Sequence, residues 1–165
     1  SITRLEEGQF VPVISRFSLL SMLSELKAEA ESLLKKDQQL ICEHDFDDLE
    51  MKSDKNILRN ILYNLVSNAV KYSEEGKKIT CRIALDDEFF FLFFTDQGMG
   101  IPLEDQKHIG SRFFRASNVV NVPGTGLGLN IVLSYLHTLK GTLSFESEPG
   151  KGTTFTITLP LSYEN

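Results

Sequence analysis

The sequence predicts an α+β domain built as two layers, with one β-sheet that carries helices on one of its faces. Segments with helical spacing of apolar residues are interspersed with segments in which apolar and polar residues alternate. No regular strand–helix–strand repeat, internal duplication or low-complexity linker divides the 165 residues. That length suits a single domain with a substantial core, so we expect one folding unit.

The composition is that of a globular protein, since 41% of the residues are hydrophobic and 24% are charged. The chain has 17 basic and 23 acidic residues, a formal net charge of −6, and no cluster of lysine and arginine. We therefore expect no nucleic-acid partner and no direct membrane contact. The longest apolar run, FFFLFF at residues 89–94, is too short to cross a bilayer.

Cys42 and Cys81 are the only cysteines, and neither belongs to a CxxC motif. This favours a reduced, cytoplasmic setting in which both are small core residues. No signal peptide is present, and the chain opens at Ser1 rather than Met. We therefore expect it to be a piece of a longer protein.

Helical patterns occur in three places after the opening residues. Ser53 or Asp54 is a suitable N-cap for the longest of the three helices, which runs to about residue 72. The other two are predicted at residues 19–36 and 127–139. The opening SITRLEEG resembles the tail of a further helix, which Gly8 ends.

The predicted strands fall into short segments and hairpins. One hairpin turns at Asp86-Asp87, and the other joins TLSFES to TFTITL through EPGKG. The FFFLFF strand lacks alternation, so it is either buried on both faces or central in its sheet. A long irregular segment is expected from residue 97 to residue 124. The remaining strands are predicted at residues 39–42, 49–51, 78–85 and 88–95.

The stretch GTGLGLNIV at residues 124–132 places three glycines at alternate positions before a helix. It is not a dinucleotide fingerprint, because Leu129 stands where the third glycine is needed and no strand directly precedes it. The lysine of a Walker loop is also absent. Backbone amides at a helix N-terminus suit a phosphate, whereas the alternative is a flexible loop leading tightly into a helix.

Three asparagines and a lysine lie in a row beside the apolar face of the longest predicted helix: Asn60, Asn64, Asn68 and Lys71. Asparagine is unfavourable inside a helix, so three of them on one edge indicate that their side chains have a role there. An amide oxygen suits a Mg²⁺ that keeps waters and bridges phosphates, and Lys71 could meet phosphate oxygens. The alternative is a polar helix edge that hydrogen-bonds to a neighbouring loop.

Asp96 begins the stretch DQGMG at the end of the apolar strand. Its carboxylate could accept a hydrogen bond from an exocyclic amine such as that of adenine, or it could simply form a turn. The irregular segment that follows has the length of a lid, with Phe113-Phe114 as an apolar latch and Arg115 as a fork for a terminal phosphate. Thr153 could complete the contacts to an adenine, and the alternative is an ordinary strand threonine.

In this order and spacing, residues 60–72, DQGMG, FFR, GTGLGL and GKGTTF closely resemble the ATP-binding catalytic domain of sensor histidine kinases. They correspond to the N, G1, F, G2 and final glycine boxes of that family. Its superfamily includes the gyrase, mismatch-repair and heat-shock chaperone ATPases. The resemblance implies the Bergerat ATP-binding fold, a mixed sheet with about three helices on one face. It also implies that residues 1–9 are the tail of a dimerisation and phosphoacceptor hairpin with its linker, and that residues 10–165 are the catalytic domain.

The resemblance also implies a role for each motif residue. Asn68 would ligate Mg²⁺, Asn64 would support the metal and the phosphates, and Lys71 would lie along the ATP. Asp96 would read the adenine amine, and Arg115 would approach the γ-phosphate from the lid. Asn64, Lys71 and Arg115 are the implied catalytic residues. The implied nucleotide contacts are Asn64, Asn68, Lys71, Tyr72, Asp96, Gly98, Gly100, Ile101, Arg115, Gly124, Thr125, Gly126, Leu127, Gly128, Leu129 and Thr153.

Two features depart from a complete kinase. The family usually has Ile-Phe-Glu before the lid aromatics, whereas this chain has Ile109-Gly110-Ser111, so it lacks one lid aromatic. None of the three histidines lies on a long helix in the His-Glu or His-Asp surroundings of the family's phosphoacceptor. We therefore expect the acceptor upstream of Ser1.

The function that the resemblance implies is a protein-histidine kinase of two-component signalling. The chain would bind Mg-ATP and transfer the γ-phosphate to a histidine on a hairpin of the same parent. A response-regulator receiver domain would then take the phosphate. The fragment is expected to be monomeric and cytoplasmic, and its parent homodimeric, with or without an anchor in the inner membrane. The alternatives are a Bergerat-fold ATPase, which Asn64 disfavours because relatives that hydrolyse ATP place a glutamate there, and a non-catalytic nucleotide sensor.

Overall fold

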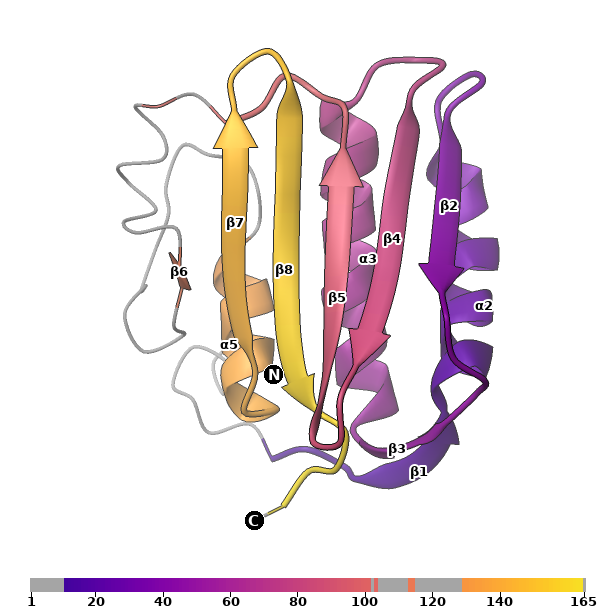
Figure 1. Cartoon of the computed structure of the whole chain (residues 1–165), viewed down its shortest axis with the longest axis vertical. Helices are drawn as coiled ribbons and strands as arrows, with labels where there is room; N and C mark the ends of the chain where they lie inside the picture. The colour runs from indigo at the N-terminus through magenta and orange to yellow at the C-terminus, as the bar shows by residue number, and fades with distance from the viewer. Residues whose placement is uncertain (1–10, 102, 104–112, 115–128, 165) are drawn as a thin grey trace.

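The computed structural model describes residues 11–101, 103, 113–114 and 129–164. In Figure 1 the strands of the main sheet lie in front and three helices, α2, α3 and α5, lie behind them. The α+β, two-layer prediction is therefore confirmed. The elements are β1 (Ser15–Ser18), α2 (Leu19–Ala30), the 3-10 turn η1 (Glu31–Leu33), β2 (Gln39–His44), β3 (Glu50–Ser53), α3 (Lys55–Tyr72), β4 (Lys78–Leu85), β5 (Phe89–Asp96), β6 (Phe113–Phe114), α5 (Leu129–Thr138), β7 (Thr142–Glu148) and β8 (Gly152–Pro160).

The main sheet is mixed and has six strands in the order β2-β4-β5-β8-β7-β6. β2 and β4 are parallel, and the other neighbouring strands are antiparallel. β1 and β3 form a separate two-stranded sheet. β5 and β8 pair along their whole length, from Phe89 opposite Pro160 to Asp96 opposite Thr153. This pairing brings the DQGMG motif next to the second half of the final glycine motif.

The helix α3 forms because its apolar residues share one broad face, which packs on the sheet. Its N-cap is Asp54 rather than Ser53: Asp54 Oδ1 accepts a hydrogen bond from the Ile57 amide at 3.0 Å. Asp54 Oδ2 also accepts from the Val13 amide at 2.8 Å. One buried carboxylate therefore both starts the helix and attaches the N-terminal segment to it.

The β5 strand is central in the sheet, between β4 and β8. Phe90, Leu92 and Phe94 are buried toward the helices, whereas the intervening phenylalanines of the strand are half-buried on the other face. The expectation of a central strand is confirmed. The other expectation, burial on both faces, is wrong, because the described helices all lie on one face of the sheet. The apolar residues on the second face hid the alternation of this strand.

The ends of α2, β2 and β3 (residues 50–53 rather than 49–51) differ from the predicted ones, and the short strands β1 and β6 were not predicted. The α-helix α2 ends at Ala30, and the chain continues as a 3-10 turn to Leu33 rather than as a helix to residue 36. β2 extends two residues beyond residue 42 to His44. The short strand β1 was not predicted, because SRFS carries no alternating apolar pattern of its own. The predicted hairpins at residues 86–87 and 148–152 are confirmed.

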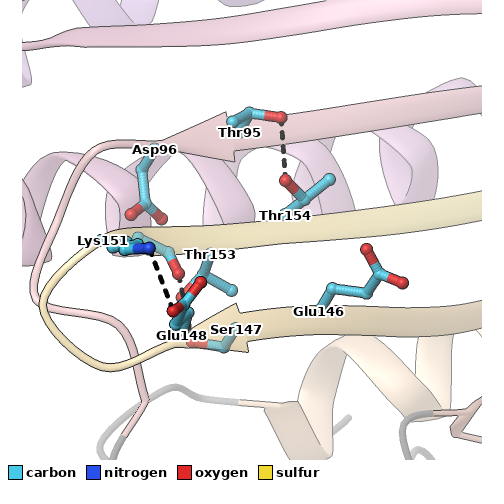
Figure 2. Close-up of a pocket in the computed structure, with 9 residues that line it drawn as sticks. Thr95, Asp96, Glu146, Ser147, Glu148, Lys151, Thr153 and Thr154 are labelled. Atoms are coloured by element: carbon cyan, nitrogen blue, oxygen red, sulfur yellow. Dashed lines mark hydrogen bonds and ion pairs between the residues drawn. The ribbon is translucent and has the colours of Figure 1, made fainter.

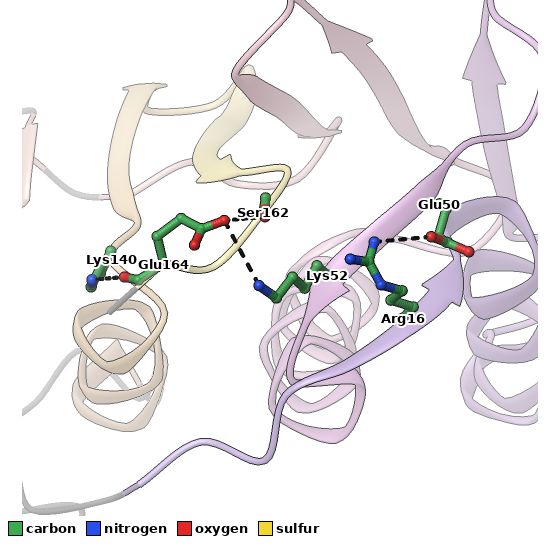
Figure 3. Close-up of polar contacts among 6 residues, drawn as sticks. All are labelled: Arg16, Glu50, Lys52, Lys140, Ser162 and Glu164. Carbon is green, nitrogen blue, oxygen red and sulfur yellow. Dashed lines mark hydrogen bonds and ion pairs between the residues drawn. The ribbon is translucent and has the colours of Figure 1, made fainter.

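The C-terminal residues after β8 run beside β3. Lys52 donates its amide to the Leu161 carbonyl at 3.0 Å and accepts from the Tyr163 amide at 2.7 Å. Figure 3 shows Glu164 within reach of the Lys52 ammonium and of Ser162, with Lys140 bonded to its carbonyl oxygen. Among the described residues, no helix has both the length and the apolar content needed to span a membrane.

Candidate functional site

The polar edge of α3 lies beside the helix face that packs on the sheet. Asn64 and Asn68 are half-buried, and Lys71 is exposed one turn later. The side-chain nitrogen of Asn64 donates to the Asn60 carbonyl at 2.7 Å. The amide oxygen of Asn64 takes no part in that bond, and the ammonium group of Lys71 lies further along the same edge.

Two side chains that were not predicted from the sequence donate hydrogen bonds to the end of α3. Gln38 is buried, and its amide nitrogen donates to the carbonyls of Val70 and Ser73, both at 3.3 Å. Lys35 Nζ donates to the carbonyls of Lys71 at 3.0 Å and Ser73 at 2.8 Å. These donors satisfy carbonyls that the last turn of a helix leaves without partners. They fix the position of Lys71 and of the residue after it.

The turn after β5 touches the end of α3 directly. The Met99 amide donates to the Tyr72 carbonyl at 3.3 Å. A β-carbon on Gly98 would lie 2.3 Å from the same carbonyl oxygen, so only glycine fits there. Gly100 has a φ of +72°, and a β-carbon on it would lie 2.4 Å from the Glu148 carbonyl oxygen. Both glycines of DQGMG are thus required by close backbone contacts within the protein itself.

Asp96 ends β5 and is paired in register with Thr153. The Gly98 amide donates to Asp96 Oδ1 at 2.9 Å. Burial of the carboxyl raises the pKa of Asp96, and hydrogen bonds from the Gly98 and Thr153 backbones oppose that rise. Figure 2 shows the carboxylate between the end of β5 and the beginning of β8.

Ser147 forms hydrogen bonds to two residues near Asp96, and it was not predicted as a site residue. Its hydroxyl accepts from the Ile101 amide at 2.7 Å and lies 2.8 Å from the Thr153 hydroxyl. Thr153 is buried, as is Ile101. Ser147 sits in the ordinary alternation of β7, so nothing local in the sequence marks it. Asp96, Ile101 and Thr153, three of the residues predicted to contact the nucleotide, lie around Ser147.

A hollow of about 450 Å³ lies at this end of the sheet (Figure 2). Three carboxylates and one lysine line the hollow, so its lining is acidic. The lysine, Lys151, forms an ion pair with Glu148, with 3.2 Å between Nζ and Oε1. Such a lining repels phosphate and suits a group that donates hydrogen bonds, such as an amine on a base. The hollow is lined by Thr95, Asp96, Glu146, Ser147, Glu148, Lys151, Gly152, Thr153 and Thr154.

Of the remaining predicted site residues, the structure describes Leu129. Leu129 is the first residue of α5 and is buried, so the predicted helix does follow the glycine stretch. Arg115, Gly124, Thr125, Gly126, Leu127 and Gly128 lie outside the described residues, as do residues 1–9 and the departure at residues 109–111.

Residues 53–163 match the family described as "Histidine kinase-, DNA gyrase B-, and HSP90-like ATPase". The chain belongs to this family. Its relatives are sensor histidine kinases: the sensor histidine kinase WalK of Bacillus subtilis is 37% identical over 121 residues, which are 71% of this chain and 20% of WalK. The chain thus spans about a fifth of the length of that relative.

Solved structures of histidine kinases have the same fold as this chain. The mycobacterial sensor histidine kinase MprB is 25% identical, has a TM-score of 0.71, and is matched over 92% of this chain and 100% of the MprB chain. Histidine kinase ThkA, solved in complex with the response regulator protein TrrA, is 24% identical with a TM-score of 0.75. That match covers 99% of this chain and 47% of the ThkA chain. The Bergerat fold expected from the sequence is thereby confirmed.

Proposed function

We propose that this chain is the catalytic domain of a sensor histidine kinase, which binds Mg-ATP and gives its γ-phosphate to a histidine on a dimerisation hairpin of the same parent. One observation supports this most strongly. The Met99 amide is bonded to the Tyr72 carbonyl, so the turn that follows Asp96 is attached to the end of the helix that carries Asn64, Asn68 and Lys71. Side-chain oxygens that suit a metal and a carboxylate that suits a base amine therefore belong to two adjoining elements.

The base would lie against Asp96, on the face of the sheet that the helices cover. The phosphates would lie toward Asn64, Asn68 and Lys71, away from the carboxylates that repel them. In this arrangement Ser147 and Thr153 position the base, while Tyr72 lies between the two halves of the site. Membership in an ATPase family supports ATP as the nucleotide.

The side chains of α3 fit a magnesium ion of a particular kind. Among the described residues, no group of three or more His, Cys, Asp or Glu side chains could hold a metal by itself. Asn68 supplies a neutral oxygen, which suits Mg²⁺ that takes its other ligands from water and phosphate. Asn68 would hold the metal and Asn64 would support it, and the metal would neutralise phosphate charge.

Phosphoryl transfer requires chiefly positioning and charge neutralisation, because its transition state is loose. Lys71 would neutralise charge on the phosphates, and Arg115 is proposed to do so at the γ-phosphate. Asn64 cannot act as a general base toward water, since an amide does not take up a proton near neutral pH. The site therefore favours transfer to an imidazole over hydrolysis.

The proposed partners follow from that reaction. His44 is exposed at the end of β2, and His137 is exposed in the last turn of α5. Neither lies on the polar edge of α3, and His108 lies outside the described residues. We propose that the phosphoacceptor belongs to the hairpin of the parent, which we propose is a homodimer. The ThkA structure with the response regulator TrrA supports a receiver domain as the second partner. We propose that this fragment alone is a cytoplasmic monomer.

The decisive experiment incubates the chain with Mg²⁺ and ATP labelled on the γ-phosphate, and measures retained ATP, free phosphate and labelled protein. We expect ATP to be retained with little phosphate release and no label on this chain. Asn64→Glu should raise phosphate release, and Asn68→Ala should remove the Mg²⁺ dependence of retention. Rapid release by the wild type would favour the ATPase alternative, and no retention at high ATP would favour a degenerate sensor.

A further inference from the structure

The two cysteines of the chain lie side by side on neighbouring strands. β2 and β4 run parallel, and Cys42 is the register partner of Cys81. Register partners share a face of the sheet, and here that face is the one covered by the helices, because Cys81 is buried in the core. Neighbouring strands lie about 4.8 Å apart. That separation falls within the roughly 4.4–6.8 Å that a disulfide spans between α-carbons.

The surroundings of the two thiols differ. Cys81 is buried and 2% exposed, whereas Cys42 is half-buried on β2, the edge strand of the sheet. A hydrogen bond from the Cys81 thiol, together with the nearby positive charges of Lys27 and His44, lowers the pKa of Cys42 to about 7, although burial and Glu31 oppose the change. The same hydrogen bond and burial raise the pKa of Cys81.

A small cavity lies beside the two cysteines, between the sheet and the helices α2 and α3. Its lining includes both cysteines, Leu23 and Lys27 from α2, and Val66 from α3. The cavity volume is about 10 Å³, which is room for about one water-sized molecule. The unequal exposure of the two thiols decides their order of reaction, because Cys42 is partly open to solvent at the sheet edge whereas Cys81 is almost fully buried.

We propose that Cys42 and Cys81 form a peroxide-responsive thiol pair, in which Cys42 reacts first and Cys81 resolves it to a disulfide. The proposal depends on two features of the pair, namely that the cysteines are register partners and that Cys42 is more exposed than Cys81. The accessible thiol of low pKa beside a second, protected thiol is the arrangement that makes a cysteine both reactive and reversibly oxidised.

The chemistry balances with a peroxide as the oxidant. The Cys42 thiolate attacks one peroxide oxygen, the O–O bond breaks, and hydroxide leaves, so the sulfur is oxidised to a sulfenic acid. The Cys81 sulfur then attacks the Cys42 sulfur, and the S–O bond breaks. The Cys81 proton leaves with that oxygen as water. In total, two thiols and hydrogen peroxide give one disulfide and two waters.

The experiment treats the reduced, folded chain with hydrogen peroxide, counts free thiols, and analyses non-reduced peptides by mass spectrometry. We expect the wild type to lose both thiols together and to give a linked Cys42–Cys81 peptide that a dithiol reductant separates. Cys81→Ser should instead accumulate sulfenic acid on Cys42, which dimedone traps. Cys42→Ser should leave Cys81 unreacted. A wild type that keeps both thiols, or a Cys81 that oxidises in Cys42→Ser, would overturn the proposal.

A second measurement tests the contact between the thiols without any oxidant. The rate of Cys42 alkylation by iodoacetamide in the wild type should rise with a midpoint near pH 7. In Cys81→Ala the hydrogen-bond donor is lost, so the midpoint should move upward. Cys81→Ser retains a donor and serves as the matched control, with a midpoint below that of the alanine variant. Identical midpoints in the wild type and in Cys81→Ala would refute the role assigned to Cys81.

Discussion

The side-chain amide of Gln38 donates to the carbonyl oxygen of Ser73 at 3.3 Å and so joins the loop before β2 to the end of α3. Gln38 is 5% exposed. A buried amide makes this contact rigid, because water cannot replace its partners. The helix that carries the proposed metal and phosphate contacts is therefore fixed at its C-terminal end from a distant part of the chain.

We expect Gln38→Leu to lower the free energy of unfolding by about 1–3 kcal/mol, because the carbonyls of Val70 and Ser73 lose a buried donor. Denaturant unfolding measures this loss. The neighbouring residue Gln39 is exposed at the beginning of β2, so Gln39→Leu is the matched control and should change stability by less than about 0.5 kcal/mol. Equal effects of the two substitutions would contradict the role of Gln38.

Gly98→Ala should destabilise the protein and weaken nucleotide binding together. The new β-carbon would meet the Tyr72 carbonyl oxygen at 2.3 Å, so the turn after β5 must move away from α3. Overpacking of this kind costs about 1–3 kcal/mol. Gly150→Ala is the control, since a β-carbon there meets nothing within 4 Å, although its φ of +82° adds backbone strain. Calorimetric titration with Mg-ADP should show the affinity loss in Gly98→Ala alone.

Asp96→Asn should weaken adenine nucleotide binding about tenfold, which corresponds to about 1.4 kcal/mol between a charged and a neutral acceptor. The proposed contact is the exocyclic amine of adenine, so the preference for ADP over GDP should also shrink. Titration of both nucleotides measures this ratio. Asp87→Asn, in the exposed hairpin turn, should leave both affinities unchanged. If Asp96→Asn retains the wild-type ratio, Asp96 does not read the base.

The raised pKa of Asp96 predicts a pH dependence of stability. Above the ordinary value of 3.8 the unfolded chain has released this proton, while the folded chain still holds it. The contribution of Asp96 to stability should therefore be greatest below pH 3.8, fall as the pH rises through the raised pKa, and stay low above it. The difference in unfolding free energy between the wild type and Asp96→Asn, measured across this range, should fall in the same way. A flat or rising difference would contradict the burial of this carboxyl.

Local patterns in the sequence determine much of this fold. The hairpin at Asp86 was predictable because Asp86 Oδ1 accepts from the amides of Glu88 and Phe89, both at 2.8 Å, within the turn itself. The α3 helix was predictable from its apolar face and its nearby cap. Both features depend on residues a few positions apart, so their physical causes are visible along the chain.

The residues that hold the proposed site in place, such as Gln38 and Ser147, could not be predicted from local sequence patterns. Gln38 acts on α3 across 32 or more positions, and nothing around it distinguishes it from the exposed Gln39. Ser147 meets Ile101 across 46 positions. Gly98 was predicted as a nucleotide contact, and the structure shows that the Tyr72 carbonyl already requires a glycine there. Sequence motifs thus identified the residues proposed to touch the nucleotide, whereas the residues that hold them in place depend on tertiary contacts.

Ser147→Ala tests whether these unpredicted supports matter for binding. The substitution removes the acceptor of the Ile101 amide, at 2.7 Å, and the neighbour of the Thr153 hydroxyl, at 2.8 Å. Because Ile101 and Thr153 are buried, we expect a loss of about 1–3 kcal/mol in unfolding free energy. Mg-ADP affinity should fall as well, since the Thr153 hydroxyl loses the partner that orients it beside Asp96. Ser144→Ala, on the same strand but at the register position opposite Thr156, is the matched control. If Ser147→Ala loses stability but binds Mg-ADP as tightly as this control, Ser147 supports the fold without positioning the nucleotide.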